Sequence, residues 1–295
     1  MNISQAIREL SNRLATVSET PSLDAQVLQA HILGASRAWI LTHPEVSLTP
    51  AQEQALRGAM ARLEGGEPLP YLLGHWEFYG LDFIVSPDVL IPRPETELLV
   101  ERALEWLRLH PGRRRAADIG TGSGCIAVSL AANLPDLYVL ATDISLPALE
   151  IAKANAEKHN LGNHIQFLHT DLLNFQPRRS IFARKDRPTL NFQPFDLIAA
   201  NLPYIPTSRL ESLAVARREP RQALDGGPDG LDAIRGLVPA AAQWLAPGGL
   251  CLLEIDASQG EAASNLAQSV FPQAEVSVVP DLAGLDRLLV VQLSV

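Results

Sequence analysis

Apolar side chains recur at helical spacing along the first sixty-odd residues of the chain. The first such set repeats every three or four residues and comprises Ile3, Ile7, Leu10 and Leu14. This spacing places the apolar side chains on one face of an amphipathic helix. A second helix start is marked at 49–52, where the sequence gives a capping Thr, a first-turn Pro and a Gln that can complete a capping box. The pattern predicts a small helical domain over residues 1–74.

The pattern changes at residue 75. Aromatic and β-branched residues alternate around Gly80 between His75 and Ser86, which predicts a hairpin linker between two domains over residues 75–90. Two prolines then fix an extended segment at 91–97. A helix through Leu98 and Leu109 is expected to follow this segment.

From residue 115 onward, short apolar runs alternate with helical patterns. The runs that predict strands are 116–119, 137–142, 165–168, 195–200, 250–255, 275–279 and 288–293. Strands separated by helices pair in parallel, with the helices covering both faces of the sheet. Only residues 280–287 separate the last two runs, which is too short for a crossover helix, so the last strand should run antiparallel. Residues 91–295 are therefore expected to form an α/β domain with a Rossmann-like, doubly wound, mostly parallel seven-stranded sheet.

Composition limits the classes of partner and compartment. The chain has 295 residues and a formal net charge of -9 at pH 7. A general grip on nucleic acid needs a basic face, so no direct nucleic-acid binding is expected. The two cysteines, Cys125 and Cys251, lie in unrelated segments without metal-ligand spacing, so no metal site is expected. With no signal sequence and no apolar run of membrane length, a reduced, cytoplasmic protein without a membrane partner is predicted.

One stretch, between Gln176 and Gln193, departs from this acidic balance. Against a single acid, Asp186, it carries the basic residues Arg178, Arg179, Arg184, Lys185 and Arg187. A solvated surface insertion is the favoured interpretation, and a dedicated anion or RNA contact is the alternative.

A glycine-rich turn follows the first strand of the expected sheet. It reads Asp-Ile-Gly-Thr-Gly-Ser-Gly, and the residues expected to border a ligand are Asp118, Gly120, Thr121, Gly122, Ser123 and Gly124. Glycines permit a tight turn and a close approach of backbone N–H groups to a ligand at a helix N-terminus. Asp143 ends the next strand, 19 residues beyond Gly124, where an acid can accept hydrogen bonds from both ribose hydroxyls. Together these features favour a nucleoside site over a plain tight turn.

The spacing of the glycines also separates cofactor classes. A dinucleotide fingerprint would have its third glycine at position 125, which is Cys125, so no pyrophosphate need be held. This favours S-adenosylmethionine, whose ammonium group Asp118 can help to orient. Asp171 and Leu172 follow the third strand, where a side chain or the backbone can contact adenine, although a turn-capping Asp is the alternative. Cys125 itself is interpreted as a small packing residue, with a thiol of lowered pKa at the helix start as the alternative.

The apolar run at 195–200 stops abruptly at a polar loop. The residues that follow it are Asn201, Leu202, Pro203 and Tyr204. Pro203 ends sheet pairing, and in open α/β sheets ligands lie beyond the carboxyl ends of the strands. Asn201 and Tyr204 are therefore expected at the rim of a ligand crevice. An ordinary Asn-Pro turn is the alternative, and the glycine loop and Asp143 of the same sheet decide against it.

Several of these motifs together resemble one family. They are Gly120 to Gly124, Asp143, the Asn-Leu-Pro-Tyr loop at 201–204, the Ile-Pro-Arg-Pro-Glu-Thr-Glu segment at 91–97, Glu-Pro-Arg at 219–221 and Leu-Asp-Gly-Gly at 224–227. The combination is similar to the release factor glutamine methyltransferases (PrmC/HemK) over nearly the whole chain. The Pro-Arg-Pro-Glu-Thr-Glu segment is its more specific mark, because an Asn-Pro-Pro-Tyr loop alone is shared with DNA adenine and some RNA guanine methyltransferases.

The resemblance implies that S-adenosylmethionine methylates the side-chain amide nitrogen, N5, of the Gln in the Gly-Gly-Gln motif of class 1 peptide chain release factors. The helical N-terminal domain would help to hold that partner. In this scheme Asn201, which also borders the cofactor, and the carbonyl of Leu202 accept the amide hydrogens. Tyr204 packs on the planar amide, and Pro203 belongs to the same substrate-binding loop.

Leu202 departs from the family pattern, which usually has a proline at this position. Because the implied role belongs to the Leu202 carbonyl, the chemistry is expected to survive, while the loop becomes less rigid. Two rival hypotheses remain from the sequence. One is a nucleic-acid methyltransferase that acts on adenine N6 or guanine N2, and the other is a non-catalytic nucleoside-binding protein.

Overall fold

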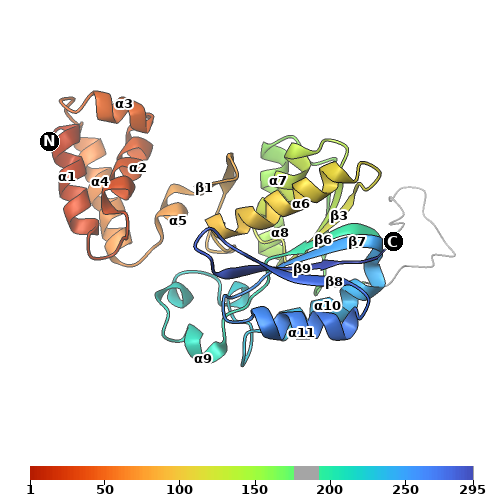
Figure 1. Cartoon of the computed structure of the whole chain (residues 1–295). Coiled ribbons are helices and arrows are strands. Elements are labelled where there is room, and N and C mark those ends of the chain that lie inside the picture. Colours follow the sequence, from red (N-terminus) through yellow and green to blue (C-terminus); the bar gives the residue numbers. More distant parts are fainter. Residues whose placement is uncertain (176–192, 295) are drawn as a thin grey trace. The chain divides into compact units, whose positions relative to one another are not determined.

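The fold was obtained as a computed structural model, which describes residues 1–175 and 193–294 (Figure 1). The basic stretch between Gln176 and Gln193 lies, apart from Gln193, outside the described residues. The chain divides into two compact units, Met1–Trp76 and Glu77–Val295. Among the described residues, no helix combines the length and the apolar character needed to cross a membrane.

The first unit is a bundle of short helices. They are α1 (Ile3–Leu14), α2 (Pro21–Leu33), α3 (Arg37–Thr42), α4 (Pro50–Glu64) and α5 (Leu69–Leu73). Capping boxes at Asn2 and Thr49 satisfy the first backbone N–H groups of α1 and α4. Fully buried Ile3, Leu28 and Met60 pack in the core of this unit. The predicted helical domain is confirmed as a fold, whereas its role in holding a substrate stays a prediction.

A two-stranded hairpin and a long helix come next. Strands β1 (His75–Phe78) and β2 (Leu81–Ile84) pair with each other. The two residues between them, Tyr79 and Gly80, have φ angles of 52° and 72°, the left-handed pair that a tight hairpin turn requires. A 3-10 turn, η1 (Pro94–Thr96), then leads into α6 (Glu97–Leu109). The hairpin and the helix both form as predicted, whereas the role of the hairpin as a linker between domains stays a prediction.

A seven-stranded sheet forms the body of the second unit. Its strands are β3 (Arg115–Ile119), β4 (Tyr138–Asp143), β5 (Ile165–His169), β6 (Phe195–Ala200), β7 (Leu245–Glu254), β8 (Glu275–Pro280) and β9 (Asp286–Gln292). Their order across the sheet is β5-β4-β3-β6-β7-β9-β8. Strand β9 runs antiparallel to β7 and to β8, and the other pairs are parallel. The predicted mostly parallel sheet with an antiparallel last strand is confirmed.

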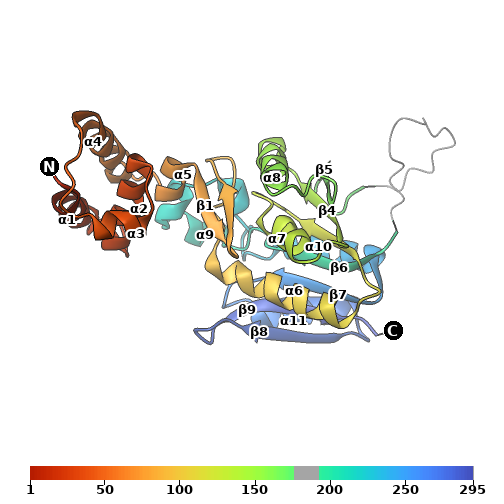
Figure 2. The same ribbon diagram turned by 90° about the horizontal axis from the view of Figure 1, so that it is seen from above.

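Helices cover both faces of this sheet. They include α7 (Cys125–Asn133), α8 (Leu146–Lys158), α10 (Asp232–Trp244) and α11 (Gly260–Val270), with the short α9 (Thr207–Leu210), η2 (Ala214–Arg217) and η3 (Arg221–Ala223) between β6 and α10. In Figure 1, α6 and α7 lie above the sheet and α10 and α11 below it. Figure 2 shows α6 lying along β6 and β7. Each face has its own buried core, one around Leu104 and Leu130 and the other around Leu237 and Ala267.

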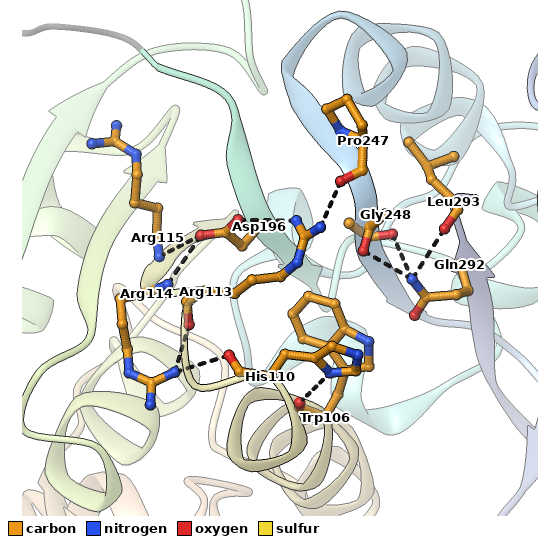
Figure 3. Close-up of polar contacts among 11 residues, drawn as sticks. Trp106, His110, Arg113, Arg114, Arg115, Asp196, Pro247, Gly248, Gln292 and Leu293 are labelled. Atoms are coloured by element: carbon orange, nitrogen blue, oxygen red, sulfur yellow. Dashed lines mark hydrogen bonds and ion pairs between the residues drawn. The ribbon is translucent and has the colours of Figure 1, made fainter. Parts of the chain in front are cut away.

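Asp196 ties the amino ends of three strands together (Figure 3). Its Oδ1 accepts a hydrogen bond from the Arg113 guanidinium at 3.1 Å, and its Oδ2 accepts from the backbone N–H groups of Arg114 and Arg115 at 3.0 and 3.1 Å. The Arg113 guanidinium also donates to the carbonyl of Pro247 at 2.7 Å and lies over the Trp106 ring. This cluster braces the starts of β3, β6 and β7, so the loops at their opposite, carboxyl ends rest on a rigid scaffold.

Candidate active site

The glycine loop connects β3 to α7 and lies at the carboxyl edge of the sheet. Gly120 and Gly124 have φ angles of 70° and 81°, in the left-handed region. A Cβ on Gly120 would lie 2.7 Å from Cδ2 of Leu202, and one on Gly124 would lie 3.1 Å from Cβ of Ala152. The left-handed conformation therefore favours glycine at both positions, and close packing against Ala152 adds to this at Gly124. The first contact also brings the glycine loop against the Asn-Leu-Pro-Tyr loop.

Asp143 ends β4, the strand beside β3, and its carboxylate is fixed by the backbone. Oδ2 accepts from the Gly122 N–H at 2.9 Å, and Oδ1 accepts from the Ser145 N–H at 2.8 Å. The residue borders the same cavity as the glycine loop. Because a carboxylate oxygen can accept more than one hydrogen bond, Asp143 retains the capacity to bind a further donor.

Asp118 lies fully buried beneath the glycine loop, not in the cavity wall. Its Oδ2 accepts from the Thr121 hydroxyl at 2.6 Å and from the Ala127 N–H at 3.1 Å. Its Oδ1 is buried without a hydrogen-bond partner among the described residues. Burial raises the pKa of Asp118 to about 7. Asp118 therefore stabilises the glycine loop through Oδ2, while Oδ1 accepts no hydrogen bond from the described residues.

The alternative of an activated thiol at Cys125 is wrong. Burial, as the main effect, together with the nearby Asp118 and Glu254 carboxylates, raises the pKa of the Cys125 thiol to about 12. These effects outweigh the influence of the helix start, so the thiol stays protonated near neutral pH. Cys125 packs beside the glycine loop, as the favoured interpretation predicted.

A cavity of about 560 Å³ brings most of the predicted site residues together. Those that line it are Gly120, Thr121, Gly122, Ser123, Asp143, Asp171, Leu172, Asn201, Leu202 and Pro203. Asp118, Gly124 and Tyr204 are not part of its wall. The cavity is also lined by residues that the sequence did not single out. Among them are Asp88, Val89, Leu90, Gln222, Ala223, Asp232, Ala233 and Gly236.

Asn201 follows β6 and is held by a chain of buried polar groups. Its Nδ2 donates to the Thr96 hydroxyl at 2.9 Å, and that hydroxyl donates to Oε2 of Glu254 at 2.6 Å. The Tyr204 hydroxyl donates to Oε1 of the same carboxylate at 3.3 Å. Burial raises the pKa of Glu254 to about 7, and burial together with the Glu254 charge raises the pKa of Tyr204. The four residues, Asn201, Thr96, Glu254 and Tyr204, are called the Asn201 relay below.

Sequence reasoning missed the roles of Thr96 and Glu254. Thr96 was present only as one letter of the 91–97 segment. Glu254 left a signal of its own, because it is the single acid at the end of the apolar run 250–255 and is only 2 % exposed. An acid at the carboxyl end of a buried central strand is a candidate site residue, since burial of a charge is costly unless it is paired.

The 91–97 segment is anchored by Glu219. Its carboxylate accepts from the Ile91 N–H at 3.0 Å and forms an ion pair with Arg93. A few residues on, the Ile205 N–H donates to the carbonyl of Leu224 and the Gly226 N–H donates to that of Ile205. The segments at 91–97 and 219–227 are thus held together, although they are far apart in the sequence. Both contribute residues to the lining of the cavity.

A glycine loop after the first parallel strand and an Asn-Leu-Pro-Tyr loop after the fourth, both on one cavity, define the second unit as a methyltransferase domain. Two family models match the chain, the PrmC N-terminal domain over residues 5–74 and the methyltransferase small domain over residues 95–181. A methyltransferase from Pyrococcus furiosus has the same fold, with a TM-score of 0.50 and 17% identity over 81% of this chain and 99% of that one.

Two full-length relatives carry the same name. The release factor glutamine methyltransferase of Moorella thermoacetica is 46% identical over 97% of both chains. That of Coxiella burnetii is 40% identical over 98% of both chains. The chain belongs to the release factor glutamine methyltransferase family.

Proposed function

We propose that this chain transfers a methyl group from S-adenosylmethionine to the side-chain amide nitrogen, N5, of the Gln in the Gly-Gly-Gln motif of class 1 peptide chain release factors. The observation that carries the proposal is the position of Asn201. It lines the same cavity as the glycine loop and Asp143. Its side-chain NH₂ group donates a hydrogen bond to the Thr96 hydroxyl. The two reduced cysteines agree with a reaction in the cytoplasm.

The cavity fits S-adenosylmethionine by the chemistry of its lining. Asp143 would accept hydrogen bonds from the ribose hydroxyls, and Asp171 or Leu172 would contact the adenine. Asp118 is not part of the lining and would act on the ammonium group from beneath the glycine loop, since its Oδ1 has no hydrogen-bond partner among the described residues. When bound, the cofactor supplies a methyl group on a positively charged sulfur, which a nucleophile can displace.

The residues of the Asn-Leu-Pro-Tyr loop would prepare the substrate amide. An amide nitrogen is a poor nucleophile, and positive charge grows on it as it attacks. The Oδ1 of Asn201 and the carbonyl of Leu202 would each accept one amide hydrogen, which orients the nitrogen and stabilises that charge. Tyr204 would pack its ring on the planar amide, with its hydroxyl held by Glu254 at 3.3 Å.

The first unit would help to hold the release factor. The match to the PrmC N-terminal domain supports this role. Trp39 and Leu41 of that unit are large apolar side chains with 38 % and 51 % exposure, as expected of a surface that binds another protein.

The proposal is tested by incubating the protein with labelled S-adenosylmethionine and a purified release factor. Mass spectrometry should locate the methyl group on the Gln of Gly-Gly-Gln, and a release factor with Gln→Ala at that position is the control. Asn201→Ala should lower kcat by a factor on the order of 100, since one charge-stabilising acceptor is lost, while cofactor affinity by calorimetry stays similar. Full activity in Asn201→Ala, or methylation elsewhere, would refute the mechanism.

A further inference from the structure

Within the Asn201 relay, the number of available protons determines which group donates and which accepts each hydrogen bond. We call this order the direction of the relay. A hydroxyl group has one proton to donate, whereas an ionised carboxylate only accepts. Thr96 donates its proton to Oε2 of Glu254, and Tyr204 donates its proton to Oε1. While Glu254 is ionised, the Thr96 oxygen can therefore only accept from Asn201, which must present its NH₂ group, Nδ2, to it.

The direction matters because the Asn side chain can turn over. The two ends of its amide have similar shape, so rotation by half a turn about the last side-chain bond would exchange Nδ2 and Oδ1. In the rotated form Oδ1 would face Thr96, and an NH₂ group would meet the substrate amide in place of an acceptor. Two donors would then face each other, and the attacking nitrogen would lose its acceptor.

Resting on the proposed function, we propose that Thr96 and Glu254 are positioning residues that keep the Asn201 amide in the orientation that offers Oδ1 to the substrate. Glu254 sets the direction of the relay and Thr96 transmits it to Asn201. Thr96 and Glu254 lie on η1 and β7 and are both 2 % exposed, so bulk water does not compete for these contacts.

The charged and titratable groups around Glu254 come from several elements. Tyr204 follows β6, Glu95 precedes Thr96 in η1, Arg287 lies on β9, and Cys125 begins α7. Arg287 forms an ion pair with Asp281. Of these, Arg287 and the hydroxyls of Thr96 and Tyr204 favour the ionised form of Glu254, and Glu95 disfavours it.

Thr96→Val and Thr96→Ser form a matched pair of variants for the test. Valine keeps the shape of threonine without the hydroxyl, and serine keeps the hydroxyl. In Thr96→Val we expect kcat for the release factor to fall about tenfold or more, with the KM for the release factor and the cofactor Kd within about threefold of the parent. Thr96→Ser should stay within about threefold in kcat. Equal kcat in the Val variant and the parent would overturn the proposal.

A double variant separates positioning from a general effect on the fold. If Thr96 acts through Asn201, then Thr96→Val should have no further effect on kcat in the Asn201→Ala background. Multiplicative losses would show that Thr96 acts by another route and would overturn the proposal.

A readout without turnover tests the relay itself. In the parent protein labelled with ¹⁵N-asparagine, the side-chain NH₂ signals of Asn201, assigned by their loss in Asn201→Ala, should shift with pH as Glu254 titrates. In Glu254→Gln, which has no titratable group at this position, this shift should vanish. Signals that do not respond to pH in the parent would overturn the relay. A parent that shows the shift but does not methylate Gly-Gly-Gln would refute only the proposed function.

Discussion

Both carboxylate oxygens of Asp143 accept backbone N–H groups, one from Gly122 in the glycine loop and one from Ser145 at the start of α8. The side chain thus shapes the loop in addition to facing the cavity. A substitution at this position is expected to disturb the cofactor site in two ways, because it removes the ribose acceptor and leaves two N–H groups to find other partners.

Asp143→Ala should weaken the binding of S-adenosylmethionine by roughly 2 kcal/mol, through lost charge-assisted hydrogen bonds. Isothermal titration calorimetry measures the change directly. Asp136→Ala is a matched control, because this carboxylate is 62% exposed and pairs with Arg114 away from the cavity. Equal affinity in Asp143→Ala and Asp136→Ala would mean that the cofactor binds elsewhere.

Leu202 has a side chain with a structural contact of its own. Its Cδ2 lies where a Cβ on Gly120 would come within 2.7 Å of it, and the residue is buried in the cavity wall. The proposed chemical role nevertheless belongs to its carbonyl, which any residue at this position provides.

Leu202→Pro should keep the carbonyl acceptor and stiffen the loop, so kcat at saturating cofactor is expected to stay within about tenfold of the parent. Leu202→Ala is the control, since it removes the contact with Gly120 without restricting the backbone. Steady-state rates of the two variants separate the effects. A collapse of kcat in the proline variant alone, with normal folding, would show that the Leu202 N–H or the freedom of the loop is needed.

The 91–97 segment depends on one buried acid from a distant element. The side chain of Glu219 is 4% exposed, accepts the Ile91 N–H and pairs with Arg93. Removal of this carboxylate would leave a buried N–H and a guanidinium without their partner. Such losses cost more than the pair itself contributes, because the remaining groups stay desolvated.

Glu219→Ala should therefore lower the free energy of unfolding of the second unit by about 2 kcal/mol. Urea denaturation followed by fluorescence measures this quantity. Glu105→Ala removes an acid from an exposed ion pair with Arg102 and should change stability by less than about 0.5 kcal/mol. If both variants unfold at the same urea concentration, Glu219 does not anchor the segment.

Elements with a local signal were predictable from the sequence, and long-range contacts were not. The period of the apolar residues located the seven strands, and strand β6 matches the predicted range 195–200. Strand β7 begins at Leu245, five residues earlier than the predicted 250, because its first part passes through Pro247 and two glycines that disguise a strand.

The site shows the same division between local and distant information. The glycine loop, Asp143 and Asn201 each follow a strand and were found by their position. Thr96 and Glu254 reach Asn201 only because η1 and the end of β7 meet the end of β6. Sequence spacings of 105 and 158 residues carry no periodic signal of such contacts.

At the scale of the whole molecule, buried and exposed acids have opposite effects on how the free energy of unfolding changes with pH. Burial raises the pKa values of Asp118 and Glu254 to about 7, from ordinary values near 4. The hydrogen bonds of Arg235 and the Leu231 N–H lower the pKa of Asp229 to about 2. Groups of the first kind stabilise the folded state when protonated, and groups of the second kind do so when ionised.

The second unit should therefore be most stable between about pH 4 and pH 5. As pH rises from there to about 7, the unfolded chain releases the protons of Asp118 and Glu254 while the folded state still holds them, so the free energy of unfolding decreases. Each group accounts for a decrease on the order of 3 kcal/mol. Below pH 4, protonation of Asp229 in the unfolded chain removes the stabilisation by Arg235. Urea denaturation at half-unit pH steps measures the curve for the parent and for Glu254→Gln, in which the decrease toward pH 7 should be smaller. Parallel curves for the two proteins between pH 4.5 and pH 7 would show that Glu254 is ionised throughout that range, which would contradict both its raised pKa and the pH-dependent shift expected of the Asn201 signals.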